Sequence, residues 1–157
     1  MSEVEIKEKD DFVIGLIEEV EDAHTDDQLD IALVNVQCNL LNKDEGDYGT
    51  YLQHYVMYLL VSYGFIDTLK DILLKTDNNE IVYRISQILF RLIQTDQQRE
   101  DFSSVDVLKI LAMAMNWNGS SKFYGMFSVS TFVQHLVISD VVARRLREVE
   151  CIDLILK

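Results

Sequence analysis

The sequence predicts an all-α fold in which helical repeats stack on one another, and three observations support this. A phrase of a large apolar residue, two spacers, Ile or Val, Asp, any residue, and Leu or Ile occurs at 63–69, 102–108 and 149–155. Proline is absent and only 6 of the 157 residues are Gly, which leaves few turn signals for a β protein. Apolar residues recur at helical spacing through most of the chain. Repeats of about 40 residues bury their apolar faces by stacking on their neighbours.

Length and charge suggest one acidic domain. We expect an acidic N-terminal lead-in at 1–9 and a single helical domain at 10–157. The net charge is -13, and residues 1–30 hold 12 Asp and Glu against two Lys. Such a charge repels phosphate backbones, so we expect no nucleic-acid ligand. Two interpretations of the acidic segment stay open, a solvated segment that aids solubility and a docking site for a partner with a basic segment.

The two cysteines, Cys38 and Cys151, both sit among apolar residues at helical spacing, which predicts buried thiols. The N-terminus lacks the apolar core of a signal peptide, and the longest uncharged apolar run, 56–61, is too short to cross a bilayer. We therefore expect a reducing compartment, cytoplasmic or nuclear, and no membrane span.

In the N-terminal third, an amphipathic helix is predicted at 10–22, from one apolar stripe. Thr25 and Gln28 have the spacing of a capping box, and a second helix follows to about Asn42. This second helix has two apolar stripes, which predicts burial on two sides. The stripes consist of Leu29, Leu33, Val36 and Leu40, and of Ile31, Val34, Cys38 and Leu41.

A polar loop at 43–47 precedes a tyrosine-rich helix at 48–62. Its tyrosines are interpreted either as core filling or as an aromatic docking face. Gly64 turns the chain into a shorter helix at 65–74. The tyrosines of this segment are Tyr48, Tyr51, Tyr55, Tyr58 and Tyr63.

The order of medium and long helices then repeats. A long helix is predicted at 78–94, with Asp77 as its N-cap and Glu80 at N3. Short, medium and long helices follow at 97–102, 105–115 and 121–138, and two further segments at 140–148 and 151–157 begin another unit. An offset of 44 residues places Val82, Ile85, Leu89 and Leu92 on Met126, Val129, Val133 and Leu136.

A repeated short helix followed by two longer ones, with a hydrophobic-x-x-[Ile/Val] junction before the second, resembles the armadillo repeat. The resemblance covers about residues 10–157 and implies a right-handed superhelix of about three stacked three-helix units. The repeats are degenerate, because the junction positions where the family often has Gly or Pro carry other residues here. HEAT-like superhelices and a compact helical bundle stay open as alternatives. The positions where the family often has Gly carry Phe65, Ser104 and Cys151, and those where it usually has Pro carry Asp67, Asp106 and Asp153.

The resemblance implies a scaffold, adaptor or regulatory subunit that binds a peptide or helix of a partner protein in a groove lined by the third helices. The expected groove residues lie opposite the apolar stripes of their own helices, where polar groups can reach a ligand backbone. Groove proteins of the importin type repeat Trp and Asn pairs on these helices. Such pairs do not occur here, and Trp117 falls in a predicted turn. The predicted groove residues are Asn35, Asn39, Arg84, Gln87, Arg91, Ser128, Thr131 and His135.

The sequence contains no recognisable motif for catalysis or for binding a cofactor. His24, His54 and His135 are far apart, with no His-x-x-x-His or Cys-x-x-Cys spacing, so neither a metal site nor a cofactor is predicted. We expect a protein that is not an enzyme. Two alternatives stay open, a small enzyme or redox protein that uses Cys38 or Cys151, and a purely structural subunit of a larger assembly.

The C-terminal residues are apolar almost to the end, whereas terminal repeats need a polar outer face. Either the natural chain continues with further repeats, or this edge is covered by a second copy or a partner. We therefore expect self-association through residues 140–157 or dependence on a partner. The apolar residues are Ile152, Leu154, Ile155 and Leu156, and they follow a basic run of Arg144, Arg145 and Arg147.

Overall fold

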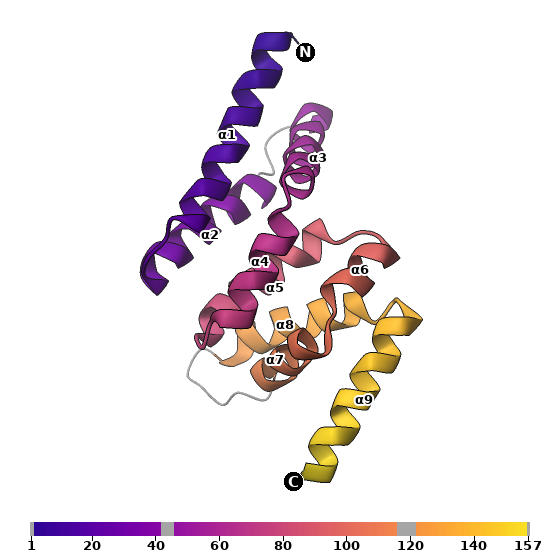
Figure 1. Cartoon of the computed structure of the whole chain (residues 1–157). Helices are drawn as coiled ribbons and strands as arrows, with labels where there is room; N and C mark the ends of the chain where they lie inside the picture. Colours follow the sequence, from indigo (N-terminus) through magenta and orange to yellow (C-terminus); the bar gives the residue numbers. More distant parts are fainter. Residues whose placement is uncertain (1, 42–45, 116–121, 157) are drawn as a thin grey trace. The chain divides into compact units, whose positions relative to one another are not determined.

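The computed structural model describes the backbone of residues 2–41, 46–115 and 122–156, and the side chains of these residues except 41, 46–53, 122–124, 126 and 150–156. Every regular element in these ranges is an α-helix, which confirms the all-α prediction (Figure 1). None of these helices combines the length and apolarity needed to cross a bilayer. In chain order, the helices are α1 (Glu3–Glu21), α2 (Asp26–Leu41), α3 (Gly46–Ser62), α4 (Phe65–Lys75), α5 (Asn79–Leu92), α6 (Asp96–Phe102), α7 (Val105–Met115), α8 (Lys122–Leu136) and α9 (Asp140–Leu156).

The chain forms two compact units, Met1–Thr68 and Leu69–Lys157, which we call unit 1 and unit 2. The boundary lies within α4. Each unit has its own buried apolar residues and is described separately below.

In unit 1, α1 packs against α2 and α3. The predicted stripe of α1 is buried, and its residues are Val13, Leu16, Ile17 and Val20. The helix begins at Glu3 rather than at Asp10, because Ser2 and Glu5 form a capping box. The backbone N–H of Glu5 donates to Oγ of Ser2 at 3.2 Å, and the backbone N–H of Ser2 donates to Oε2 of Glu5 at 2.8 Å. Hydrogen bonding of the Glu5 carboxylate with the backbone N–H of Ser2, and to a smaller extent with the Ser2 side chain, lowers the pKa of the Glu5 carboxyl.

Only one of the two apolar stripes of α2 is buried. Leu33, Val36 and Leu40 are fully buried, whereas Ile31 is 63% exposed and Cys38 is also exposed. The predictions that α2 is buried on two sides and that Cys38 is a buried thiol are therefore wrong. The neighbours of α2, α1 and α3, cover its other side, where the Leu33 stripe lies. Cys151 lies outside the described side chains.

The tyrosines of α3 do not all fill the core. Tyr58 is 66% exposed and Tyr63 is also exposed, so the core-filling interpretation is wrong for these two. Tyr55 is half-buried, and its hydroxyl donates to Oδ1 of Asp10 at 3.4 Å. The two remaining tyrosines, Tyr48 and Tyr51, lie outside the described side chains.

Gly64 separates α3 from α4, as the sequence predicts. Its φ is 77°, a left-handed conformation that glycine adopts at low cost. Its N–H donates to the carbonyl of Val61 at 3.1 Å, which satisfies one of the free carbonyls at the end of α3. The chain then enters α4 at Phe65, which is fully buried.

In unit 2, α5 and α8 are the central pair, and α7 packs on both. The described residues that the 44-residue offset superposes are buried on both helices, so their predicted place in the core is confirmed. Met126 lies outside the described side chains. The rings of Phe102 and Phe132 meet edge to face with their centroids 5.6 Å apart. Unit 2 therefore has an apolar core built mainly between α5, α7 and α8.

Two predicted boundaries in unit 2 are wrong. The N-cap of α5 is Asn78, whose side chain accepts from the N–H of Glu80 at 2.9 Å, and not Asp77. The two segments predicted at 140–148 and 151–157 are not separate, because Asp140–Leu156 is one continuous helix, α9. Glycine, proline and a polar cap are absent from the Val149–Glu150–Cys151 junction, so the helix continues. At the other two junctions one helix ends and the next begins, at Gly64 and at the Ser103–Ser104 pair.

Candidate interaction surface

The helices α5 and α8 lie close together at Gly125. A Cβ atom built on Gly125 would lie 2.0 Å from Cε2 of the Tyr83 ring, so only glycine fits here. Tyr83 is itself buried. Burial, and to a smaller extent the carboxylate of Glu80, raise the pKa of the Tyr83 phenol. The ring of Tyr83 thus takes the place of a side chain on α8 and holds the two helices close together.

Two contacts between side chains continue this line of contact along the pair. Nε2 of Gln87 donates to Oγ of Ser128 at 2.8 Å, and both residues are half-buried. The rings of Phe90 and His135 lie with their centroids 5.1 Å apart at an angle of 60°. The structure therefore brings three of the predicted groove residues, Gln87, Ser128 and His135, to the seam between α5 and α8.

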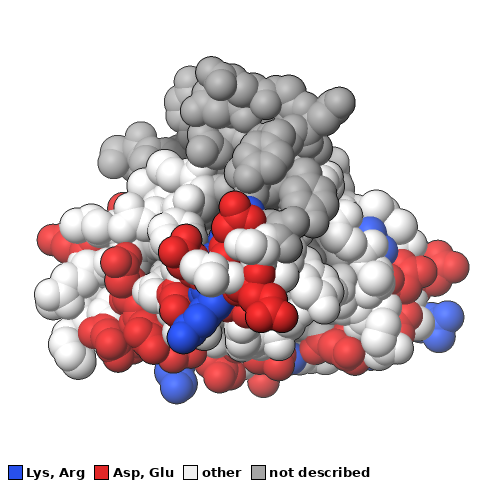
Figure 2. Space-filling model, turned by 90° about the horizontal axis from the view of Figure 1, so that it is seen from above, with Lys and Arg blue, Asp and Glu red and all other residues white. Residues whose placement is uncertain are grey.

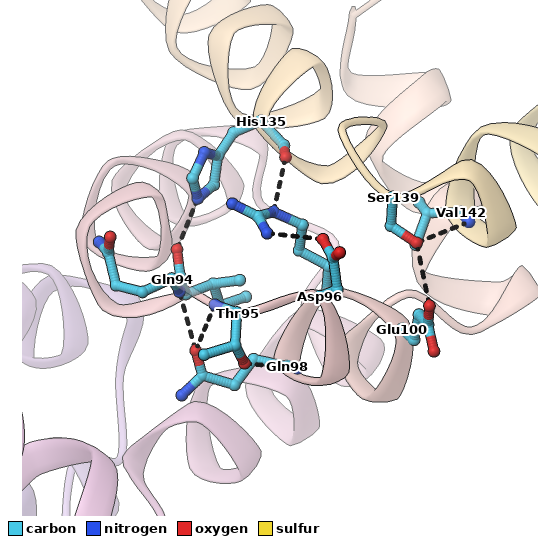
Figure 3. Close-up of polar contacts among 10 residues, drawn as sticks. Gln94, Thr95, Asp96, Gln98, Glu100, His135, Ser139 and Val142 are labelled. Atoms are coloured by element: carbon cyan, nitrogen blue, oxygen red, sulfur yellow. Dashed lines mark hydrogen bonds and ion pairs between the residues drawn. The ribbon is translucent and has the colours of Figure 1, made fainter.

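His135 also has a structural role, as Figure 3 shows. Its Nε2 atom hydrogen-bonds to the carbonyl of Ile93, the C-cap residue of α5. Its own carbonyl, near the end of α8, accepts a hydrogen bond from Nε of Arg99 at 3.0 Å. The imidazole therefore connects the ends of two helices and is not simply presented to solvent.

The other predicted groove residues fall into two groups. Arg84 and Arg91 lie on the same side of α5 as Gln87, at i-3 and i+4 from it, and Thr131 lies one turn after Ser128 on α8. All three are half-buried. Asn35 and Asn39 belong to α2 of unit 1, where Nδ2 of Asn35 donates to Oε2 of Glu19 at 3.2 Å and Nδ2 of Asn39 donates to the Asn35 carbonyl at 2.8 Å.

Two exposed aromatic residues on this helix pair were not predicted. Phe90 is 41% exposed on α5, and Phe127 is 68% exposed on α8. Each directly neighbours a predicted groove residue, Arg91 and Ser128 respectively. A signal for them was present in the sequence, because both lie outside the buried stripes of their helices. We use the name α5–α8 surface for this set of residues, which comprises Arg84, Gln87, Phe90, Arg91, Phe127, Ser128, Thr131 and His135.

Cationic side chains contact the ends of helices α6 and α8. Arg99 is only 8% exposed, and its Nη1 atom lies 2.9 Å from Oδ1 of Asp96. Nη1 of Arg145 donates to the carbonyls of Glu100 and Ser103 at 2.8 and 3.1 Å, and Nζ of Lys70 donates to the carbonyl of Asp101 at 3.0 Å. Positive groups at a helix C-terminus donate hydrogen bonds to its free carbonyls and interact favourably with the negative end of the helix dipole.

Hydrogen bonds hold the short helix α6 at both ends. Thr95 and Gln98 form a capping box at its start, and Oγ of Ser139 donates to Oε1 of Glu100 at 3.2 Å near its end (Figure 3). Arg145, one member of the predicted basic run, is therefore a structural residue. The other two members, Arg144 and Arg147, are exposed.

Among the described side chains, no three His, Cys, Asp or Glu residues lie close enough together to hold a metal ion. Comparisons with protein-family models, with curated proteins and with solved structures find no match to this chain.

Proposed function

We propose that this chain is a non-catalytic protein-interaction module, an adaptor, scaffold or regulatory subunit, that binds a peptide or helix of a partner protein. The observation that supports this most is the α5–α8 surface, where exposed aromatic rings and half-buried polar residues lie together on two closely packed helices. We further propose that the helices belong to a right-handed superhelix of the armadillo type, in a cytoplasmic or nuclear protein without a cofactor.

The composition of the surface suits partner binding. Aromatic residues and arginine are the residue types that dominate the binding energy of protein interfaces. Phe90 and Phe127 supply exposed aromatic area. Arg84 and Arg91 supply two cations about two helical turns apart on α5. A ligand with carboxylates and apolar side chains would complement this combination.

The contacts along the seam also suit binding. Gly125, the Gln87–Ser128 bond and the His135–Ile93 bond hold the α5–α8 surface in one arrangement before any ligand arrives. A surface that is ordered in advance loses less conformational entropy on binding.

The proposal is tested by replacing both arginines of the surface. Wild-type protein and the Arg84→Glu/Arg91→Glu variant are used to capture proteins from native lysate, and the captured proteins are quantified by mass spectrometry. The matched control is Arg144→Glu/Arg147→Glu, which makes the same change in charge at exposed positions of α9. Partners of the α5–α8 surface are lost with the first variant and kept with the second. Equal capture by both variants, with unchanged helix content by circular dichroism, would refute this surface.

The alternative of a thiol enzyme gains little from the exposure of Cys38. A catalytic thiol is activated by a neighbouring base or cation, which exposure alone does not supply. The residues one turn before Cys38 on α2 are Val34 and Asn35, and neither is a base. Fast alkylation of Cys38 would reflect its exposure as much as any catalytic role.

A further inference from the structure

An exposed apolar stripe runs along α2 in unit 1. Ile31, Val34 and Cys38 follow one another at i, i+3 and i+7, which places them on one side of the helix. Ile31 is 63% exposed, Cys38 is exposed and Val34 is half-buried. An exposed β-branched side chain in line with two further apolar residues is typical of a surface that another element covers.

The surroundings of this stripe are strongly acidic. Residues 18–30 include seven Asp and Glu and no Lys or Arg. Unit 1 holds 16 of the 27 acidic residues and 3 of the 14 basic ones, which leaves 11 of each for unit 2. The net charge of -13 therefore belongs to unit 1 alone, and Figure 2 shows acidic side chains spread far more widely than basic ones over the viewed face.

Helix stability does not account for all of these carboxylates. Asp26 and Asp27 lie in the first turn of α2, where the helix dipole stabilises negative charge. Glu18, Glu21 and Asp22 lie at the C-terminal end of α1, where the same dipole disfavours it, and no basic residue occupies that turn. Negative charge has thus accumulated at a place where it opposes folding, and a positively charged ligand would relieve that cost.

The stripe and the acidic residues belong to one surface that spans α1 and α2. Nδ2 of Asn35 donates to Oε2 of Glu19 at 3.2 Å and joins the two helices beside the stripe. Phe12 lies seven residues before Glu19, on the same side of α1, and is 50% exposed. We name this the α1–α2 surface, and its members are Phe12, Glu19, Ile31, Val34, Asn35 and Cys38.

We propose that the α1–α2 surface binds a basic amphipathic helix of another protein. Apolar residues of such a helix would cover Ile31 and Cys38, and its Lys or Arg residues would face the surrounding carboxylates. A second copy of the chain is a poor occupant, because it would bring one unit of charge -13 against another. This site is separate from the α5–α8 surface and does not depend on it.

The test uses a defined probe, a fluorescent peptide of about 14 residues, or about four helical turns, with Leu on one face and Lys on the other. Fluorescence anisotropy measures its affinity for the full chain. The Ile31→Ser variant is expected to bind the peptide about tenfold more weakly, because part of an isoleucine side chain no longer becomes buried. Met113→Ser, a change at a 72% exposed residue of α7, is the matched control and should leave the affinity unchanged.

Two further measurements separate specific docking from attraction between opposite charges. A peptide with Glu in place of Lys should fail to bind, and the Lys peptide should slow the alkylation of Cys38 by iodoacetamide, followed by mass spectrometry of the Cys38 peptide. The Arg84→Glu/Arg91→Glu variant should bind the Lys peptide as well as wild type, so failure of this site and failure of the α5–α8 surface are distinguishable.

Several results would overturn the proposal. An affinity of Ile31→Ser equal to those of Met113→Ser and wild type would show that the peptide responds to net charge only, as would unchanged alkylation of Cys38. Analytical ultracentrifugation measures whether the wild-type chain forms a dimer. A dimer that becomes a monomer in Ile31→Ser would show that a second copy of the chain binds this surface instead.

Discussion

The Tyr83 ring of α5 lies directly against Gly125 of α8, and Cε2 of the ring stands 2.0 Å from where a Cβ of residue 125 would be. Alanine in a helix is ordinarily about 1 kcal/mol more favourable than glycine. Here the ring is buried and cannot move aside without disturbing the core. The packing of this one pair thus reverses the usual preference of a helix for alanine.

The first prediction is that Gly125→Ala lowers the free energy of unfolding by about 2 kcal/mol, the typical cost of overpacking a core. Urea denaturation followed by circular dichroism measures this change. Gly15→Ala in α1 is the matched control, because a Cβ there has nothing within 4 Å, and it should be neutral or stabilising. Greater stability of Gly125→Ala than of wild type would contradict the close approach of Tyr83.

The second prediction concerns the turn between α3 and α4. Gly64→Ala should destabilise the protein by about 1 kcal/mol, because the φ of 77° is unfavourable for a residue with a Cβ atom. Open space surrounds the Cβ position, so the whole effect comes from the backbone. Gly64→Asn should cost less than Gly64→Ala, since asparagine tolerates the left-handed region. Equal stabilities of the two variants in urea denaturation would contradict this account.

The third prediction concerns the buried Arg99. Arg99→Ala should lower the free energy of unfolding by about 2–3 kcal/mol, because it leaves the carbonyl of His135 and the carboxylate of Asp96 without this donor. Arg99→Lys should restore little, since a single ammonium lacks the fork that reaches both oxygens. Arg144→Ala, at an exposed position, is the control, and a similar urea midpoint for all three variants would count against the network in Figure 3.

The fourth prediction concerns alkaline pH. The pKa of Tyr83 is raised in the folded state by burial and by Glu80, whereas the unfolded phenol titrates near its ordinary value of about 10. Above that pH, the unfolded state binds fewer protons than the folded state, so the free energy of unfolding falls as pH rises. The contribution of Tyr83 to the free energy of unfolding is fully present below about pH 10 and is lost as the pH rises through the raised pKa of the folded state.

Tyr83→Phe tests this linkage, because phenylalanine keeps the ring without the ionisable group. Above about pH 10, the wild-type free energy of unfolding should fall more steeply with pH than that of the variant. Urea denaturation at several pH values measures both slopes. Parallel curves would show that the phenol of Tyr83 titrates equally in both states. The absorbance of tyrosinate gives an independent readout of the same difference.

Much of the helical pattern could be predicted from the sequence because helix periodicity is a local property. The stripe of α1, the break at Gly64 and the 44-residue correspondence between α5 and α8 all follow from spacing along the chain. Sequence patterns gave a wrong helix boundary where the chain carries no clear signal for a helix to stop. The junction at Val149 resembled two others in its apolar residues but lacks a residue that stops a helix.

The candidate site was less accessible from the sequence, since it depends on which residues of different helices meet. Gln87 and Ser128 are 41 residues apart, and His135 contacts a carbonyl 42 residues earlier. The helical period indicated that Gln87, Ser128 and His135 lie outside the apolar stripes of their helices, and in the structure all three are half-buried. Their hydrogen-bond partners could not be read, because they come from distant parts of the chain.

The amino-acid sequence alone was enough to establish helices, their approximate order and the concentration of acidic residues near the N-terminus, all of which depend on composition and short-range spacing. Packing between distant segments determined that the Leu33 stripe of α2 is covered while Ile31 and Cys38 are exposed, and that the ring of Tyr83 occupies the space beside Gly125. Both stripes of α2 are apolar, so hydrophobicity alone does not say which of the two is buried. The positions of α1 and α3, which pack against α2, decide it.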